Sequence, residues 1–584
     1  MMHLETLVIT LQLSTVEELP SAQQRIYVLS VEQMSINVVA ADRRIETLQQ
    51  DDIHHFQTNK RLSFPLTAAY NENDDNGDCI FSPPIILNRL IQALHSGKKH
   101  KLILRKWKQG AKWWNLNMNH TSDDTSSSSS FTTTTIGNSS DNNNNNNTVA
   151  MARAEVAGYR LAKLAMNHHS QQHLNNNNKK KKRKISAYVP DVVYFSHDDN
   201  DTVDTEGDDP WALFSYFGSS SNRTEGLDDD ENDERNNIDI NIINNSNLNW
   251  DIEKAVMMSI ANTPQLSSSH HNHLIECKHY PSTMTKIRHE FGFDEPHPRH
   301  GRVPIDECSD YAHIILRDVV LPVQFSFFEW SSSSSSSSSI QSSVNGVEWK
   351  HNLCALAVDS QTSKPFQYHD MIAVYRLALQ RLSSSAQQTA SIIDDERMDT
   401  LLQMMQECVT ALEHEWDDGH DDNYCQHPPP LPAVVCHMDL QPQNLTFWHD
   451  RTNDSEKKDT NVNVHDSKHC SVASVMDFEE AAYADPRFEV LLICRKVLAN
   501  LEQAKELWES YSSSVKLQTT WDVGPIEPWL RLETVHSLFT LLLQANNLLG
   551  GGRNPWETKP DLWGKIDRER MRLVRMGWSF CSVD

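Results

Sequence analysis

The residues of this chain with the clearest capacity for chemistry lie in one stretch of its C-terminal half. Residues 434–448 (VVCHMDLQPQNLTFW) place Asp439 in a polar turn between two apolar runs, with Asn444 five residues later. Another carboxylate, Asp477, ends the next apolar run, in the sequence SVMDFEE. Phosphoryl transfer needs one carboxylate to accept a hydroxyl proton and hard oxygen ligands to hold Mg²⁺ against the phosphates. The pattern therefore predicts a phosphotransferase site.

The joint pattern HMDLQPQN and MDFEEAAYADPRFE resembles the aminoglycoside phosphotransferase and choline kinase superfamily, whose members are relatives of protein kinases. Its members carry a His-x-Asp-x-x-x-x-Asn loop, then an Asp-Phe/Trp-Glu segment with a downstream Asp-Pro. The resemblance implies that Asp439 is the catalytic base and that Asn444 and Asp477 hold magnesium. It also implies that His437 braces the catalytic loop and that Asp485 steadies this loop from the following helix.

The same resemblance assigns nucleotide-binding roles in the N-terminal half. Arg105, at the end of the strand-like run KLILRKW, resembles the basic residue that grips the nucleotide phosphates, and Lys106 takes this role if the register is shifted by one. Glu155, on a helix-like segment, resembles its ion-pair partner. Asn88 in SPPIILNR resembles part of the nucleotide loop, although the glycines of that loop are absent. Residues 211–217 would supply the hinge that hydrogen-bonds adenine. The alternatives are an ordinary strand end for the two cations and a solvated helix face for Glu155.

Hydrophobic periodicity sets the expected elements around these residues. Strands are predicted at 4–13, 101–107, 187–195 and 211–217, with a helix at 149–166. Further helices are predicted at 251–261, 306–328, 369–382 and 394–416, then short strands at 433–436, 445–448 and 471–478, and helices in the last quarter. This order predicts an α+β, bilobal, protein-kinase-like fold with a small β-rich N-lobe and a larger, mainly helical C-lobe. We assign 1–60 to an N-terminal extension of uncertain structure, 61–249 to the N-lobe and 250–584 to the C-lobe.

Low-complexity and polar tracts interrupt this pattern, and they predict three insertions in the fold, at 117–147, 331–345 and 450–468. Such tracts bury too little apolar surface to offset the entropy of ordering them, so we expect disordered surface insertions. The last one lengthens the hairpin between the Asn444 run and the Asp477 run. Because loop closure entropy grows slowly with length, it need not disturb the site.

Composition narrows the function classes. The formal net charge is −26, which argues against nucleic acid as the main partner because phosphate backbones demand a basic face. The ten cysteines form no CxxC pair, which favours a reduced, cytoplasmic protein. The N-terminus makes a poor signal peptide, and no apolar run approaches the length that spans a bilayer, so we expect no membrane partner. The basic run from Lys179 to Lys184 resembles a nuclear localisation signal, with a solvated loop as the alternative.

Other interpretations stay open at this stage. A cluster of His270, His271, His273, Cys277 and His279 has the residue types of a zinc site but lacks a second spaced pair. Residues 286–304 are either a surface connection or part of the wall on the acceptor side. The rival function is a catalytically inactive kinase-like protein that binds a nucleotide or a partner. A protein kinase proper is disfavoured, because no Ala-Pro-Glu segment follows Asp477 at the expected distance. The predicted activity thus needs ATP, Mg²⁺ and a small-molecule hydroxyl acceptor.

Overall fold

The computed structural model of this 584-residue chain falls into two compact units. The first comprises residues 1–163 and 189–276, and the second comprises residues 164–188 and 277–584. The structure describes residues 5–19, 24–40, 60–67, 87, 90–91, 93–94, 101–107, 142–176, 187–197, 210–216, 239–243, 276–279, 305–333, 368, 371–373, 375–376, 379–380, 396–417, 431–440, 444–449, 470–478, 481–496, 501–550 and 553–580.

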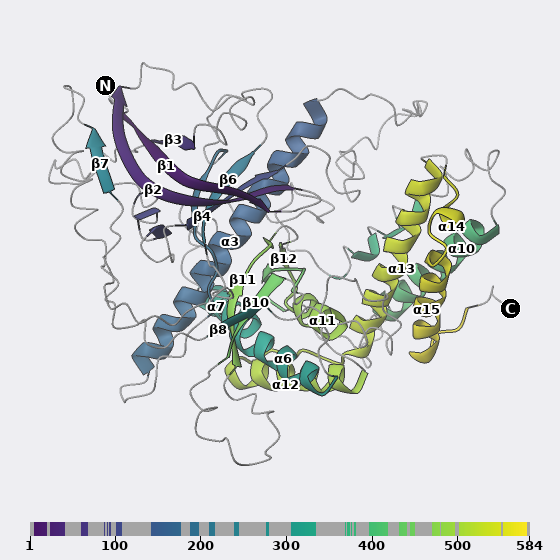
Figure 1. The fold of residues 1–584 in the computed structure, drawn as a ribbon. Helices are drawn as coiled ribbons and strands as arrows, with labels where there is room; N and C mark the ends of the chain where they lie inside the picture. Colours follow the sequence, from purple (N-terminus) through teal and green to yellow (C-terminus); the bar gives the residue numbers. More distant parts are fainter. Residues whose placement is uncertain are drawn as a thin grey trace, which may run out of the picture. The chain divides into compact units, whose positions relative to one another are not determined.

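The first unit is built on a curled sheet whose two longest strands are β1 (Glu5–Leu19) and β2 (Gln24–Ala40). Side chains of a strand alternate between its faces, and in β1 the buried Ile9, Leu11 and Leu13 alternate with partly exposed residues. The two strands pair antiparallel from Glu5 opposite Ala40 to Leu19 opposite Ile26, with an irregularity near Leu13. They form the purple ribbons of Figure 1.

Five further strands extend this sheet. They are β3 (Arg61–Thr67), β4 (Lys101–Trp107), β5 (Val192–Phe195), β6 (Trp211–Ser215) and β7 (Asp239–Ile243). The order is β3-β1-β2-β4-β6-β5, and all neighbours along this path are antiparallel. The edge of β2 away from β1 is shared, because β4 pairs with its first half and β7 runs parallel to residues 33–37.

Helical residues cover the core of the first unit. Leu87, Leu90, Ile91 and Leu94 have the spacing of one helix face, and all four are buried against the strands. Helix α3 (Asn142–Asn176) carries Glu155 in its middle, and the boundary between the units falls within this helix, after Lys163. Lys163 joins α3 to the segment before β5, since its Nζ lies 2.9 Å from Asp191 Oδ2.

A long helix of the second unit contains a π turn. The π segment Leu316–Val320 lies between α6 (Ile305–Ile315) and α7 (Leu321–Ser333), and Leu321 N–H donates to Leu316 O five residues back. Pro322 explains the wider turn, because proline has no N–H and its ring clashes with the carbonyl four residues earlier. The helix continues through the whole span predicted at 306–328, with its geometry changed at this one point.

Four short strands follow in the described part of the chain. β9 (Val434–Cys436) pairs with β12 (Ala482–Ala484), and β10 (Leu445–His449) pairs with β11 (Cys470–Val475). A strand from far back in the sequence, β8 (Glu276–His279), completes the sheet β11-β10-β8. Because β10 and β11 pair directly, the expectation that the Asn444 run and the Asp477 run are neighbouring strands is confirmed.

The rest of the second unit is helical. Its helices are α10 (Glu396–Asp417), α11 (Arg487–Lys496), α12 (Leu501–Gln518), α13 (Glu527–Gly550), α14 (Pro555–Thr558) and α15 (Leu562–Arg575). Helix α13 packs against both α10 and α15, side by side in Figure 1. Trp529, near the start of α13, is fully buried against Phe488 and Trp508.

The curled antiparallel sheet and the many helices agree with the predicted α+β class. The strand predicted at 4–13 is part of β1, and β1 and β2 are the two longest strands of the same sheet that holds β4 and β6. The first compact unit extends to residue 276, and α3 contributes to both units, whereas the lobe boundary at residue 249 stays a prediction. The helix predicted at 251–261, the run from Lys179 to Lys184 and residues 286–304 lie outside the described residues. Of the helices described, none has the length and apolar character needed to cross a membrane.

Candidate active site

The candidate site of the second unit begins where β9 ends. The turn after Cys436 carries His437, Met438 and Asp439, all of them buried. Met438 has φ 62°, in the left-handed region that a residue with a Cβ rarely adopts. The backbone therefore reverses sharply between the strand and Asp439, which presents the carboxylate at the strand end.

Asn444 is fixed directly onto Asp439. Its Nδ2 donates to both the backbone O and the carboxylate Oδ2 of Asp439, each at 2.9 Å. Both residues are nearly buried, with 7% of Asp439 and 5% of Asn444 exposed. In this geometry the amide nitrogen of Asn444 is committed to Asp439, so its Oδ1 is the end of the amide that can ligate a cation.

Asp477 reaches the same place from β11. Met476, the residue before it, donates its N–H to Asn444 O at 2.9 Å, and its carbonyl lies 2.8 Å from His437 Nε2. Asp477 itself has φ 68°. The structure thus places Asn444 directly before β10 and Asp477 two residues after β11, its antiparallel partner, with Asp439, after β9, hydrogen-bonded to Asn444.

His437 connects these pieces in a defined tautomer. Because its Nε2 faces the carbonyl of Met476, this nitrogen carries the proton. Nδ1 is then the acceptor for the N–H of Asp439, at 3.3 Å. The ring also packs on Phe478, with ring centroids 4.4 Å apart. The loop-bracing role expected for His437 agrees with these contacts.

The residue that holds the turn at His437 from α11 differs from the expected one. The sequence pattern assigned this role to Asp485, but the carboxylate that accepts the backbone N–H of His437 belongs to Glu489, one helical turn later. The Asp485 carboxylate instead binds Arg487, through Nε at 2.9 Å and Nη2 at 2.6 Å. Asp485 meets β9 through its backbone O, which lies 3.7 Å from Cys436 Sγ.

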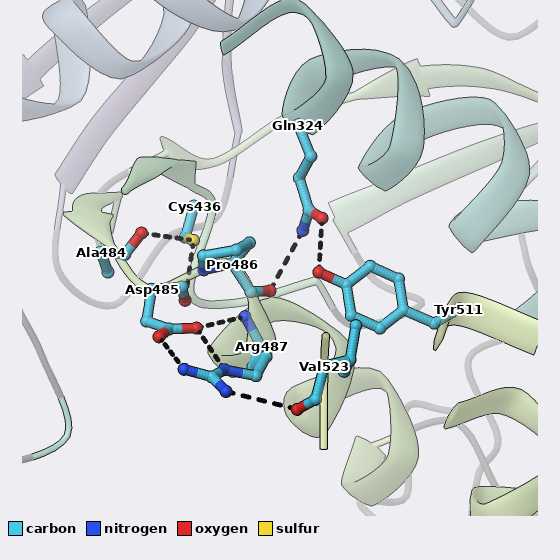
Figure 2. A network of polar contacts seen from close by, with 8 residues as sticks. All are labelled: Gln324, Cys436, Ala484, Asp485, Pro486, Arg487, Tyr511 and Val523. Atoms are coloured by element: carbon cyan, nitrogen blue, oxygen red, sulfur yellow. Dashed lines mark hydrogen bonds and ion pairs between the residues drawn. The ribbon is translucent and has the colours of Figure 1, made fainter. Parts of the chain in front are cut away.

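Figure 2 shows the buried network around this ion pair. Arg487 also donates to Val523 O and lies over the ring of Trp529, 4.6 Å from its centroid. Gln324 of α7 joins the network, since its amide nitrogen donates to Pro486 O at 3.1 Å and its amide oxygen accepts from Tyr511 at 2.8 Å. These contacts fix the start of α11, and α11 carries Glu489.

Burial makes Cys436 a poor candidate for a nucleophile. Its thiol lies one residue before His437, yet desolvation raises its pKa well above the usual value. Because the neutral thiol is a poor nucleophile, Cys436 serves packing and not chemistry here.

In the first unit, β4 and α3 form a buried ion pair. Arg105 Nη1 binds Glu155 Oε1, and Glu155 is fully buried. The register therefore settles on Arg105 as the partner of Glu155, with Lys106 buried beside it. The other carboxylate oxygen of Glu155 accepts from Trp107 Nε1 at 2.9 Å, and the Arg105 guanidinium lies 5.6 Å from the centre of the Trp107 ring.

Sequence reasoning missed both Glu489 and Trp107. Trp107 stands two residues after Arg105, and the alternation of a strand places these side chains on the same face, which was the available signal. Glu489 stands in the first turn of the helix that follows Asp485-Pro486. An acidic residue there is ordinary for helix N-termini, so its contact with the catalytic loop has no distinct sequence signature.

The remaining sequence candidates are only partly placed. Asn88 lies outside the described residues, and its neighbours Leu87 and Leu90 are helical and buried. The proposed hinge begins with β6, an inner strand between β4 and β5. Of the histidine and cysteine cluster, Cys277 and His279 lie in β8, and the other members lie outside the described part of the chain.

The residue types present fit a magnesium ion. Among the described residues there is no group of three or more His, Cys, Asp and Glu that could hold a metal by itself. Mg²⁺ does not require one, because it is commonly bound through one or two protein oxygens together with phosphates and water. Asp477 and the amide oxygen of Asn444 are a donor set of this kind.

Comparisons of this chain with protein-family models, curated proteins and solved structures gave no match. The function is therefore inferred from the sequence pattern and from the geometry of the site.

Proposed function

We propose that this chain is an ATP- and magnesium-dependent phosphotransferase of protein-kinase-like, bilobal type that phosphorylates a hydroxyl group of a small molecule. The observation that carries the proposal is that hydrogen bonds link Asp439, Asn444 and the backbone next to Asp477. Asn444 is bonded to Asp439, and Met476, next to Asp477, is bonded to both Asn444 and His437. A fixed base beside hard oxygen ligands is what phosphoryl transfer requires.

Backbone strain gives independent support. Among the described residues, three other than glycine have positive φ: Lys60, Met438 and Asp477. Two of the three belong to the candidate site. Conformations of this kind cost roughly 1–3 kcal/mol each and cluster at sites where function demands a particular side-chain direction.

In the proposed reaction, Asp439 accepts the proton of the acceptor hydroxyl while the hydroxyl oxygen attacks the γ-phosphorus of ATP. The bond from this phosphorus to the β–γ bridging oxygen breaks, and ADP leaves with that electron pair. Asn444 keeps the Asp439 carboxylate oriented throughout, and with Asp477 it would hold magnesium. Bound magnesium supplies neutralisation of the phosphate charge. In the first unit, Arg105, held by Glu155, is the proposed phosphate-binding cation.

The short path after Asp477 favours a small acceptor over a protein substrate. The chain enters β12 at Ala482 and α11 at Arg487, within ten residues of Asp477. A protein kinase uses a long activation segment at this point to bind its peptide substrate. Here that length is absent, so the acceptor is expected to be small.

The test is the dependence of ATP binding on metal. ATP with Mg²⁺ should raise the melting temperature of the purified chain, because a ligand at 100 times its Kd stabilises by about 2.7 kcal/mol, and EDTA should remove most of this gain. Asp477→Asn should abolish the metal-dependent part. The matched control is Asp567→Asn, which removes an exposed carboxylate on α15 and should behave as wild type.

Turnover then separates an enzyme from an inactive binding protein. Asp439→Asn should keep the melting shift with Mg-ATP and lower phosphate transfer by roughly 10²–10⁴, the usual contribution of a general base. A screen of hydroxylated metabolites with labelled ATP supplies the acceptor. Equal stabilisation by ATP with Mg²⁺ and with EDTA would contradict the assigned metal ligands.

A further inference from the structure

A buried aspartate on the π turn contacts the strand that ends at Asp477. Asp318 lies within the π segment, and 3% of it is exposed. Its Oδ2 accepts the backbone N–H of Val472, in the middle of β11, at 3.1 Å. The adjacent Arg317 holds the same carboxylate with two N–H groups, at 2.7 and 2.8 Å. The carboxylate is therefore fixed in direction and bonded to a strand 154 residues away in sequence.

A bulge in β11 explains why this strand needs such an anchor. Thr446 lies opposite Ser474 but Phe447 lies opposite Val472, so β11 has one extra residue, Ala473. A bulge of this type breaks the alternation of the ladder and bends the strand. As a result, N–H groups three residues apart point away from β10: that of Val472 to Asp318, and that of Val475 to Tyr188 O at 2.9 Å.

These two bonds hold the outer edge of β11 on both sides of the bulge. The strand then passes through Met476 to Asp477, which has the left-handed backbone conformation. Because a bulged strand of six residues has few ladder bonds of its own, its direction depends on the groups that bind its outer edge. The Val472 anchor lies five residues before Asp477.

The same helix also fixes the neighbouring segment of the site. Gln324, one and a half turns after Asp318, accepts from Tyr511 and donates to Pro486 O, at the start of α11 (Figure 2). The π turn changes the phase of the helix between these two side chains. One helix thereby binds both the strand that leads to Asp477 and the helix that carries Glu489.

We propose that Asp318 is a positioning residue for the metal ligand Asp477, acting through the backbone of β11; this rests on the proposed function. The π segment Leu316–Val320 places the carboxylate against the strand edge, and two hydrogen bonds from Arg317 hold it there. Removal of the carboxylate leaves the Val472 N–H buried without its acceptor, and the bulged strand is then free to shift. Asp477 moves with it, and magnesium binding weakens.

The experiment compares three variants of the full chain. Asp318→Ala removes the acceptor, and Asp318→Asn keeps an oxygen for Val472 but loses the charge that Arg317 binds. The matched control is Ser326→Ala, which removes another buried hydrogen bond of the same helix, from Ser326 Oγ to Ala165 O. Each is measured in two ways: hydrogen exchange of peptides covering 470–478, and the Mg²⁺ concentration that gives half of the ATP-dependent melting shift.

For Asp318→Ala we expect faster exchange in 470–478 and about a tenfold higher half-saturating Mg²⁺ concentration, with KM for the acceptor unchanged. Asp318→Asn should fall between Asp318→Ala and wild type. Ser326→Ala should lower the melting temperature without changing the Mg²⁺ requirement.

Two results would overturn the inference. Unchanged exchange in 470–478 would show that Asp318 does not anchor β11. If Asp318→Ala shows faster exchange but needs no more Mg²⁺ than the control Ser326→Ala, Asp318 anchors β11 without positioning Asp477. If the wild-type chain itself shows no Mg²⁺-dependent ATP binding, the proposed function fails and the positioning role fails with it, whereas the exchange data would still report on the anchor.

Discussion

Met438 and Asp477 share a backbone conformation that costs free energy, and each is placed next to a residue whose hydrogen bonds hold it there. His437 precedes Met438 and is bonded through its N–H to Glu489 and through its ring to Met476. Met476 precedes Asp477 and is bonded to Asn444 as well. Strain of this kind persists only where the surroundings fix the backbone on both sides. At the scale of single residues, the site is therefore a set of mutually bonded turns.

Trp107 gives a prediction at the same scale, in the first unit. Its indole N–H is bonded to Glu155, so Trp107→Phe removes a bond that orients the Glu155 carboxylate while keeping a ring beside Arg105. A hydrogen bond to a charged group contributes about 1.5–3 kcal/mol, and part of this loss should appear as looser placement of Arg105. We expect KM for ATP to rise about 3- to 10-fold with little change in KM for the acceptor.

The control for this prediction is Trp563→Phe on α15, which also removes an indole N–H but lies far in sequence from β4. It should leave both KM values unchanged. A rise in KM for ATP in Trp563→Phe of the same size would mean that the effect is one of general stability.

At the scale of elements, the hairpin of β10 and β11 was predictable from sequence. Its two apolar runs have the alternation and length of strands, and Asn444 and Asp477 lie at their ends. The long strands β1 and β2 were only partly predictable, because periodicity marked 4–13 and then became mixed. Their length depends on pairing with each other and with β3 and β4, which is a tertiary effect that local pattern does not contain.

The π turn and the loop brace were not predicted, for two different physical reasons. Pro322 was visible in the sequence, but a proline within a helical pattern can end, kink or widen the helix, and packing decides which. The brace was assigned to Asp485 by position. Its neighbour Arg487 takes that carboxylate instead, because a buried guanidinium needs a partner.

The exchange of roles between Asp485 and Glu489 gives an element-scale prediction. Asp485→Asn leaves Arg487 buried without its ion-pair partner, so it should lower the free energy of unfolding by about 3–5 kcal/mol. Glu489→Gln keeps an acceptor for the His437 N–H and loses the charge, which should cost about 1 kcal/mol of stability. Its main effect should be on turnover, because the catalytic loop is held less firmly.

Urea unfolding and steady-state kinetics on the two variants measure these effects separately. The assignment would be wrong if Asp485→Asn reduced turnover at unchanged stability while Glu489→Gln did nothing to turnover. That result would return the bracing role to Asp485.

At the scale of the whole molecule, the low-complexity tracts account for much of the chain length but carry none of the site contacts described here. The described contacts of the site in the second unit come from 305–333, 431–440, 444–449, 470–478 and 481–496. The buried ion pair of the first unit joins β4 and α3. The strongest test of the hypothesis that these tracts are dispensable insertions concerns residues 450–468, between β10 and β11. His449 and Cys470 lie directly opposite each other in the ladder, so a short turn can join the two strands.

We therefore expect that replacing residues 450–468 with a four-residue Gly/Ser linker preserves the fold and the melting shift with Mg-ATP. Shortening the loop should stabilise slightly, by about 0.6 kcal/mol per halving of its length, because loop closure becomes less costly in entropy. A second variant, with the same linker in place of residues 450–472, removes Val472 and with it the bond to Asp318. This variant should lose the Mg²⁺-dependent part of the shift. If instead the shorter replacement abolishes Mg-ATP binding in a protein with normal secondary structure, the pairing of β10 with β11 is not what brings Asp477 to Asn444, and the phosphotransferase proposal loses the geometry on which it stands.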